Sequence, residues 1–344
     1  MSERKEDIQA FLDTYQQLIG ASLQTKQDQL IDFITYHEKD KTSPRKYVFI
    51  TSGKMNVPLE RNTVRYISNF STGRRGAQSS EEFLKNGYVV VFLTHESAKR
   101  PLNILEHVNP DSFTLNENDG LVSFSSSNEK LKQLVRLRKK VNSEKLLLEI
   151  SYDTLFEYLL MLKFICKDVI GDLNLGRRAI LYAAAAVSDF YIPYDEMSEH
   201  KIQSRNVQDG KLELVLSQTP KMLKMVKSEW CPQAFVVTFK LESDVGIIDE
   251  KVKQAMQNYG MDIVLSNILS TKETKIYVHE KRILEEKVKF DSGQLVEKSS
   301  NQDCLEVELI PLLCAKHNRY MMSPTPPTVS SEGSSSKIVH DIQN

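Results

Sequence analysis

Apolar residues along the chain follow two alternating patterns. Over residues 8–34 they recur about every 3.6 residues, which predicts one or two amphipathic helices interrupted near Gly20. Residues 46–53 and 88–94 instead form short continuous runs rich in β-branched and aromatic side chains, which predict buried strands. Between them, residues 76–86 place small and apolar side chains on one helical face. The first part of the chain is therefore predicted to alternate between helix and strand.

The alternation continues through the rest of the chain. Further strands are predicted at residues 146–150, 180–186, 234–239, 262–267, 275–279 and 286–290, and a hairpin-like run at 212–217. Further helices are predicted at residues 130–141, 155–170, 220–227 and 245–258, followed by a helix that ends around Pro311. Such alternation is typical of an α/β fold in which a mostly parallel sheet carries helices on both faces. Ligands of such folds bind at the carboxyl ends of the strands, so functional residues are expected there.

Charge and composition exclude several classes of function. The 45 Lys and Arg residues balance 46 Asp and Glu residues, so the net charge of −1 gives no global field that would steer the protein to nucleic acid or to an anionic membrane. The longest apolar runs are well short of the roughly 20 residues that a transmembrane helix needs. The N-terminus lacks the basic-then-apolar layout of a targeting signal, and we expect a cytoplasmic protein. Four scattered cysteines indicate neither a disulfide framework nor a zinc site.

The length of 344 residues allows one large domain or two ordinary ones. Because the strand and helix pattern is continuous, we predict a single domain over residues 46–322, preceded by a helical extension at 1–45. Residues 323–344 are rich in Pro, Ser and Gly and are predicted to be a disordered tail.

The most informative turn is the segment SNFSTGRRG, which ends at Gly76. Ser71, Gly73 and Gly76 lie at the start of a predicted helix, where backbone amides bind anions and glycine lets a phosphate approach the main chain. Arg74 and Arg75 would add positive charge. The segment is neither a Walker A loop nor the dinucleotide fingerprint GxGxxG, and taken alone it is equally compatible with a glycine-rich helix cap.

A resemblance that covers most of the chain favours the functional interpretation. The segments VPLE, TVRYISNFSTGRRG, AAAVSDFYIP, EHKIQS, TPKML and TFKLESD occur in this order. From about residue 47 to residue 321 the chain is similar to eukaryotic phosphopantothenoylcysteine synthetases, the phosphopantothenate–cysteine ligases of coenzyme A biosynthesis. The resemblance implies a Rossmann-like, three-layer α/β homodimer with a small strand element for dimerisation or as a flap. It also implies that ATP, or CTP as in bacterial relatives, is used with Mg²⁺ to join 4′-phosphopantothenate to cysteine.

On the family pattern, a nucleotide site is formed by residues at predicted strand ends and helix starts, namely Gly53, Ser71, Gly73, Gly76, Phe239 and Asn267. Glycine suits a close backbone approach, the Ser71 hydroxyl can donate a hydrogen bond, and the Phe239 ring can contact a base. Asn267 ends its predicted strand, where its amide could orient the acyl-phosphate linkage of an activated intermediate or simply form an Asx-turn.

The resemblance also implies a phosphopantothenate site. This site would comprise Asn69, Ala185, Ala186 and Asp189, with Arg65 reaching in from the second subunit. The small alanines would let the pantothenate chain lie against the backbone, and the Arg65 guanidinium suits bidentate contacts with a phosphate dianion. Asp189 could accept a hydrogen bond from the substrate, and Lys201 is a further phosphate partner with a catalytic role. The residues that would hold a metal ion are not identified.

The expected chemistry needs no protein nucleophile. Transfer of the nucleotide's α-phosphoryl unit to the pantothenate carboxylate gives an acyl-adenylate and pyrophosphate, and attack by the cysteine amine then releases AMP. Catalysis would rest on positioning and on electrostatic stabilisation by backbone amides, cationic side chains and magnesium. Neither a general base for the cysteine ammonium nor the residues that bind cysteine can be identified.

Two alternatives stay open, and the first of them rests on a departure from the family pattern. Many family members have Ser-Gly-Gly-Thr after the first strand, whereas this chain has Lys54 and Met55 after Ser52 and Gly53. If position 54 needed a left-handed backbone, Lys54 would be strained there and nucleotide affinity would suffer. A regulatory homologue that has lost catalysis is therefore one alternative. The other is a nicotinamide-dependent oxidoreductase of similar fold, against which the missing GxGxxG and ribose-binding acid argue.

Overall fold

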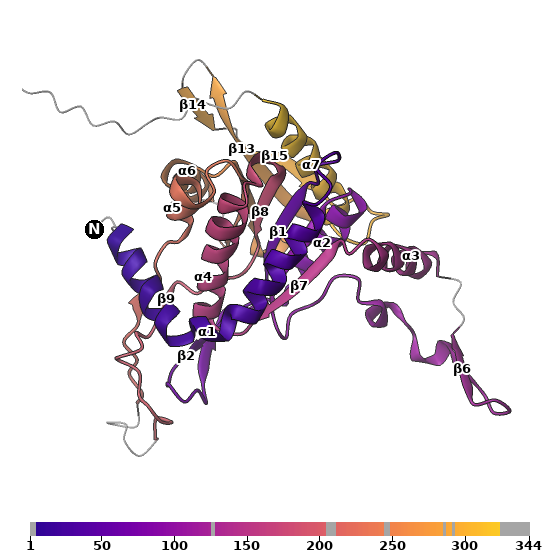
Figure 1. Cartoon of the computed structure of the whole chain (residues 1–344), viewed down its shortest axis with the longest axis horizontal. Coiled ribbons are helices and arrows are strands. Elements are labelled where there is room, and N and C mark those ends of the chain that lie inside the picture. The colour runs from indigo at the N-terminus through magenta and orange to yellow at the C-terminus, as the bar shows by residue number, and fades with distance from the viewer. Residues whose placement is uncertain are drawn as a thin grey trace, which may run out of the picture.

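A nine-stranded sheet forms the centre of the computed structural model, which describes residues 5–124, 128–203, 211–243, 248–284, 287–290 and 293–323 (Figure 1). The strand order is β14-β13-β12-β11-β8-β1-β4-β7, and β15 pairs with β13. The strands are β1 (Tyr47–Ser52), β4 (Val89–His95), β7 (Leu147–Tyr152), β8 (Ala179–Ala183), β11 (Phe235–Glu242), β12 (Ile263–Ile268), β13 (Lys275–Leu284), β14 (Lys287–Phe290) and β15 (Gln294–Glu297). As their continuous apolar runs predict, β1 and β4 are buried at every position.

The central strands are parallel. Strands β7, β4, β1, β8, β11 and β12 pair in parallel, and the antiparallel strands β13, β14 and β15 extend the sheet beyond β12. From β1 the chain moves outward through β4 and β7, and then crosses to the other side of β1 to form β8, β11 and β12. The order thus reverses between β1 and β8, at the kind of switch point where open α/β sheets bind ligands. The predicted α/β fold with a mostly parallel sheet is confirmed.

Helices cover both faces of this sheet, as predicted. They are α1 (Lys5–His37), α2 (Arg74–Lys85), α3 (Glu129–Ser143), α4 (Leu155–Lys163), α5 (Leu223–Met225), α6 (Ile248–Tyr259) and α7 (Glu306–Met322). On one face α2 packs against α7, and Ser79 of α2 contacts the Tyr182 hydroxyl of β8 at 2.9 Å. On the other face the Tyr158 hydroxyl of α4 lies 3.5 Å from Oγ1 of Thr51 in β1. Helix α1 packs on α4, and α6 lies beside β11 and β12.

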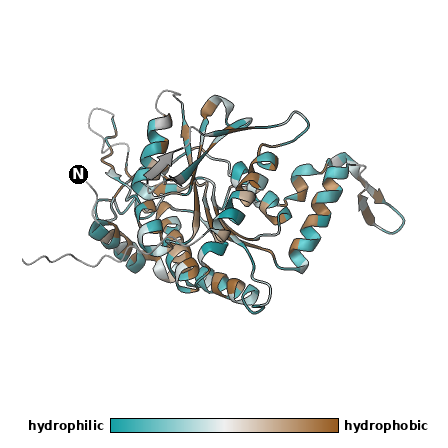
Figure 2. Ribbon diagram, turned by 90° about the horizontal axis from the view of Figure 1, so that it is seen from above, coloured by the Kyte–Doolittle hydropathy of each residue, from teal (hydrophilic) through white to brown (hydrophobic). Residues whose placement is uncertain are grey.

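A single apolar core joins these layers. It runs from Ile8 in α1 through the central strands to Leu313 in α7. Figure 2 shows apolar residues gathered on the central strands and hydrophilic residues along the outward faces of the helices. Helix α1 therefore belongs to the same core as the sheet.

In the described part of the chain, three short strand pairs lie outside the central sheet. They are β2 (Asn56–Pro58) with β3 (Tyr66–Ser68), β5 (Phe113–Asn116) with β6 (Leu121–Phe124), and β9 (Phe190–Tyr191) with β10 (Ser217–Gln218). The β5–β6 hairpin projects from the body of the molecule (Figure 1). The small strand element expected for dimerisation or as a flap stays a prediction.

Two predicted helix boundaries are wrong. Helix α1 runs through Gly20 without a break, because its packing against α4 outweighs the roughly 1 kcal/mol that glycine costs inside a helix. Helix α7 continues past Pro311, where the buried side chains of Leu309, Ile310 and Leu313 hold it against the core.

Two predicted strands are shorter than expected. The strand predicted at residues 180–186 ends at Ala183, although the amides of Ala184 and Ala186 still donate to carbonyl oxygens at the end of β1. Of the run at 212–217 only Ser217 belongs to a strand.

The predicted tail at 323–344 lies outside the described residues except for Ser323. The division into an extension, a domain and a tail therefore stays a prediction. None of the helices described is both long enough and apolar enough to cross a membrane.

Candidate active site

A cleft of about 900 Å³ opens at the carboxyl ends of β8, β11 and β12, on the β8 side of the switch point. One wall is the turn at residues 70–76 that leads into α2, and another is the segment 183–189 that follows β8. Helix α6 and residues 218–223 close the remaining side. The predicted site residues that line the cleft are Ser71, Gly73, Gly76, Ala185, Ala186, Asp189, Phe239 and Asn267.

The N-terminus of α2 forms part of the cleft wall. Gly73 caps the helix with a φ of 73°, and as a glycine it offers no side-chain acceptor to the amides that follow. A Cβ at Gly73 would lie 2.7 Å from that of Ala98, and a Cβ at Gly76 would lie 2.2 Å from Oγ of Ser52. Both positions therefore require glycine. Because the first amides of a helix lack intrahelical partners and carry partial positive charge, this end of α2 can bind an anion.

Phe239 and Asn267 point to the same face of the sheet as α2. Successive strand residues point to opposite faces, and Phe239 packs edge-on against Tyr182, which contacts α2. Asn267 pairs in register with Leu241, two residues after Phe239, and therefore shares its face. Asn267 is 5% exposed and lies within β12, one residue before its end, which corrects the predicted strand boundary and disfavours an Asx-turn.

Arg75 is held in place by three contacts. Its Nη1 donates to Oε1 of Glu306 at 3.0 Å, and its Nη2 donates to the carbonyl oxygen of Lys272 at 2.6 Å. The guanidinium carbon lies 5.8 Å from the ring centroid of Phe239. Burial raises the pKa of Glu306, and Arg75 opposes this shift. Arg75 thus orders the ring of the predicted nucleotide site, whereas Arg74 is half exposed.

The segment after β8 is fastened to the end of β1. The amide of Ala184 donates to the carbonyl oxygen of Thr51 at 3.0 Å, and the amide of Ala186 donates to that of Gly53 at 2.9 Å. The amide of Ala185 lies 3.3 Å from Oγ1 of Thr51. Gly53 does not line the cleft. With a φ of 90°, it instead positions the alanines that do.

Asp189 lies at the end of this segment, and Asn69 contacts the same segment from another part of the chain. Oδ1 of Asp189 accepts from Nζ of Lys221 at 2.6 Å, and the Asp189 side chain is 67% exposed. Nδ2 of Asn69 donates to the carbonyl oxygen of Val187 at 3.0 Å. Asn69 does not line the cleft, but the structure brings it against the predicted substrate segment.

Arg65 and Lys201 lie apart from the cleft of their own chain. Nε of Arg65 donates to Oε1 of Glu60 at 2.9 Å, and Nη2 of Arg65 donates to the carbonyl oxygen of Ile202 at 2.9 Å. Burial alone would raise the pKa of Glu60, but hydrogen bonds from Arg65 and from backbone amides outweigh it and the pKa is lowered. Lys201 is exposed. A single chain therefore does not bring either residue to the cleft.

The turn after β1 carries the departure from the family pattern. Lys54 is not among the residues with positive φ, and its Nζ lies 5.3 Å from the ring centroid of Tyr66. Met55 is fully buried. The backbone strain on which the non-catalytic alternative depended is therefore absent from this turn.

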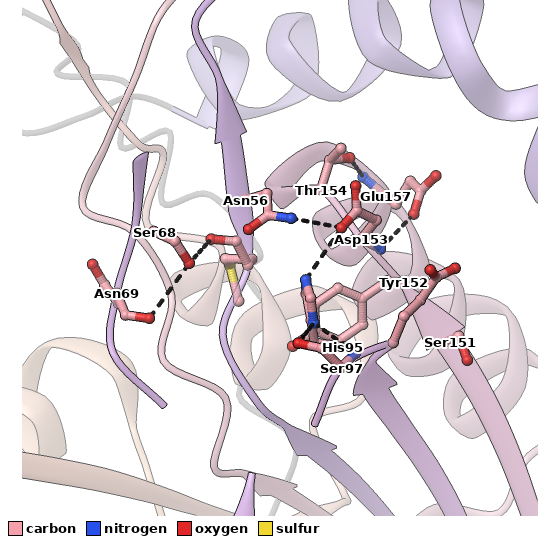
Figure 3. A network of polar contacts seen from close by, with 12 residues as sticks. Asn56, Ser68, Asn69, His95, Ser97, Ser151, Tyr152, Asp153, Thr154 and Glu157 are labelled. Carbon is pink, nitrogen blue, oxygen red and sulfur yellow. Dashed lines mark hydrogen bonds and ion pairs between the residues drawn. The ribbon is translucent and has the colours of Figure 1, made fainter. Parts of the chain in front are cut away.

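A polar network that the sequence analysis missed holds the same turn (Figure 3). His95, at the end of β4, places Nε2 3.2 Å from Oδ1 of Asp153, and Nδ2 of Asn56 donates to the same oxygen at 2.6 Å. Nδ1 of His95 accepts from the amide of Ser97 at 3.1 Å, so the ring proton resides on Nε2, toward Asp153. Burial lowers the pKa of His95, although Asp153 opposes the shift. The network ties β2 to the ends of β4 and β7.

Other residues of the site also escaped the sequence analysis. The cleft is lined by Lys221, in the segment TPKML, and by Lys240, in the segment TFKLESD. His95 and Lys240 both lie at the carboxyl ends of buried strands, where functional residues were expected. Their position at strand ends is a signal in the sequence, but it does not distinguish them from other polar residues at strand ends.

Several carboxylates of the cleft are already paired with basic groups. These pairs are Asp189–Lys221, Glu273–Arg74 and Glu306–Arg75. Within the described residues, no group of three or more His, Cys, Asp and Glu side chains is arranged to hold a metal ion. A magnesium ion here would therefore take most of its ligands from nucleotide phosphates and water.

Comparisons with known proteins agree with this architecture. Residues 172–303 match the family model of the DNA/pantothenate metabolism flavoprotein C-terminal domain. The chain is 37% identical over 297 residues to phosphopantothenate–cysteine ligase 2 of Oryza sativa subsp. japonica, covering 85% of this chain and 87% of that protein. It is 35% identical over 294 residues to phosphopantothenate–cysteine ligase CAB2 of Saccharomyces cerevisiae, covering 80% of this chain and 77% of that protein.

A solved structure shares the fold over nearly the whole length. It is a Cab2 mutant in complex with phosphopantothenate-cysteine, with a TM-score of 0.74 and 31% sequence identity, and the match covers 89% of this chain and 98% of that one. The sheet, the cleft-forming segments and the sequence therefore point to one assignment. The chain belongs to the phosphopantothenate–cysteine ligase family.

Proposed function

We propose that the protein joins 4′-phosphopantothenate to cysteine at this cleft and consumes a nucleoside triphosphate. The observation that carries the proposal is the joint placement of two predicted half-sites in one cleft. The α2 N-terminus, Phe239 and Asn267 form a half suited to a nucleotide, and the segment from Ala184 to Asp189 forms a half suited to an extended amide chain. A ligase must bring a carboxylate and a phosphorus atom into contact, and adjoining half-sites allow this.

The proposed reaction begins with activation, because a carboxylate resists attack by an amine. A carboxylate oxygen attacks the α-phosphorus, the bond to the β-phosphate breaks, and pyrophosphate leaves with the bonding electrons. The cysteine amine then attacks the acyl carbon, loses a proton, and AMP leaves. Backbone amides of α2 would stabilise the phosphate oxygens, and Asn267 would orient the acyl-phosphate linkage.

ATP is the proposed nucleotide, with CTP as the alternative, and the reaction is placed in the cytoplasm. Magnesium would enter with the phosphates, whose negative charge it offsets. Asp189 is assigned to the substrate because its exposed carboxylate lies at the end of the alanine segment. Lys201 is assigned to a phosphate, as the family pattern implies.

Arg65 is assigned to the cleft of a second subunit in a homodimer. Its own cleft does not include it, while its side chain remains 37% exposed beside Glu60. Its chain neighbours Val64 and Tyr66 are also exposed, at 57% and 49%. Exposed apolar and aromatic side chains flanking an arginine suit a subunit interface.

Product analysis tests the proposal. The purified protein is mixed with ATP, Mg²⁺, phosphopantothenate and cysteine, pyrophosphate release is followed, and phosphopantothenoylcysteine is identified by mass. We expect turnover with all four, a single stoichiometric burst without cysteine, and no release without phosphopantothenate. Replacing ATP with CTP measures nucleotide preference. Absence of product together with thermal stabilisation by NAD(P), and not by ATP or CTP, would instead favour the oxidoreductase alternative.

A further inference from the structure

Lys240 occupies the point on β11 where the two halves of the cleft meet. It follows Phe239 directly, so its side chain leaves the strand on the face opposite to Phe239 and α2. In register it pairs with Ser266 of β12, while Thr238 pairs with Ala183 of β8. Thr238, Phe239 and Lys240 all line the cleft. The end of β11 thus presents Phe239 to one half and Lys240 to the other.

The ammonium of Lys240 sits in a cationic environment. Burial lowers its pKa most, and Lys221 and Lys251 lower it further, whereas Glu242 and Asp189 oppose the shift. Asp189 is already paired with Lys221 at 2.6 Å. In the part of the chain that the structure describes, Lys240 belongs to no ion pair and no side-chain hydrogen bond.

Among the described residues Lys240 is thus a half-buried cation without an ion pair, and no described side chain replaces the hydration that it has lost. An anionic ligand in the cleft would restore the missing interaction. Both proposed substrates carry phosphate, which makes phosphoryl oxygen the matching ligand chemistry. Because Lys240 lies where the two half-sites adjoin, the matching group is the α-phosphoryl group, which passes from one substrate to the other during the reaction.

We propose that Lys240 donates a hydrogen bond to an oxygen of the α-phosphoryl group while that group passes from the nucleotide to the substrate carboxylate. This inference rests on the proposed function and adds a catalytic residue to it. In the step, the carboxylate oxygen bonds to phosphorus, the bond to the β-phosphate breaks, and pyrophosphate carries away the electron pair. Lys240 keeps its protons and contributes charge. The α2 amides and Lys240 hold the transferring group from opposite faces of the sheet.

The first test compares Lys240→Met with Lys253→Met. Lys253 lies on α6 but is exposed and does not line the cleft, so it is a matched control for loss of a positive charge. We expect the first-turnover rate of pyrophosphate release to fall about 100-fold in Lys240→Met, in the range typical of a lost transition-state donor, and to be unchanged in Lys253→Met. Lys240→Arg keeps the charge and is expected to retain part of the rate.

The second test measures contact without relying on turnover. An amine-reactive acylating probe is applied to the wild-type protein, and labelling of each lysine is read by peptide mass mapping. Lys240 is expected to react in the free protein and to be protected when a non-hydrolysable ATP analogue and phosphopantothenate are both present. Labelling of Lys253 is expected to be the same in both states.

The outcomes separate this inference from the proposed function. If the wild-type protein forms no phosphopantothenoylcysteine, the proposed function fails. If it does form product and Lys240→Met behaves like Lys253→Met, or if Lys240 is not protected, the role of Lys240 is refuted. A loss confined to affinity for ATP alone or for phosphopantothenate alone, with an unchanged first-turnover rate, would place Lys240 on an outer phosphate and overturn its assignment to the transferred group.

Discussion

The buried imidazole of His317 makes the stability of the fold depend on pH. His317 lies on α7 with no exposed surface, its Nε2 donates to the carbonyl oxygen of Arg177 at 2.9 Å, and its Nδ1 accepts from the Tyr88 hydroxyl at 2.8 Å. This arrangement fits a neutral ring with one proton. Burial lowers the pKa of His317 to about 4. The same side chain in an unfolded chain has a pKa of about 6.5.

These two pKa values fix the sign and size of the effect. Between pH 6.5 and pH 4 the unfolded chain binds a proton that the folded chain excludes, so acidification favours unfolding. The contribution of His317 to the free energy of unfolding is complete above about pH 6.5. It falls by about 2 kcal/mol from pH 7 to pH 5, and by about 3 kcal/mol once the pH is below about 4.

The substitution His317→Gln isolates this contribution. The glutamine amide does not titrate, and it can still donate to Arg177 and accept from Tyr88, so we expect a cost of about 1 kcal/mol at pH 7. Urea unfolding at pH 7 and pH 5 should show that the wild-type protein loses about 2 kcal/mol more than the variant. The exposed His107→Gln serves as the control and should follow the wild type. Equal losses in wild type and His317→Gln would refute the reasoning.

Three further predictions concern the site. Asn267→Asp should impair the attack of cysteine more than the activation of the carboxylate, because an aspartate would repel the anionic intermediate. Rapid-quench analysis should then show accumulated acyl-nucleotide, and equal loss of both half-reactions would contradict this role. Arg65→Ala and Asp189→Ala should each be inactive. Subunit exchange between the two variants should restore up to roughly a quarter of wild-type activity, because half of the dimers then contain one intact site; inactive heterodimers would rule out an active site shared between subunits. Gly76→Ala should destabilise the protein by about 1 to 3 kcal/mol, because its Cβ would lie 2.2 Å from Oγ of Ser52, and an unchanged melting temperature would show that α2 can shift freely.

The fold could be predicted from the sequence largely because the central strands are buried on both faces. A strand such as β4 has apolar residues at nearly every position, and this signal survives without knowledge of its neighbours. Features set by tertiary contact could not be predicted in this way. Gly20, for example, stays helical because α4 supports α1.

In the candidate site, too, residues with a local sequence signal could be predicted and residues that depend on tertiary contacts could not. Ser71, Gly73 and Gly76 could be found because a glycine-rich turn before a helix has a local meaning. The functional importance of Lys240 and His95 could not be judged from the sequence. It depends on which strands lie side by side and on how deeply each side chain is buried. A lysine near the end of a strand is ordinary, and Lys240 becomes informative only because it forms no ion pair with any residue that the structure describes.

Helix α1 imposes an order on the folding of this chain. Tyr15 of α1 stacks on Phe156 of α4 with ring centroids 3.9 Å apart, and Phe11 packs against the same ring. The ribosome completes α1 at His37 but reaches Leu155 only more than a hundred residues later, which at translation speeds takes on the order of ten seconds. During that interval the apolar stripe of α1 has no native surface to cover it. Helix α1, although made before α4, therefore docks only after α4 has been made.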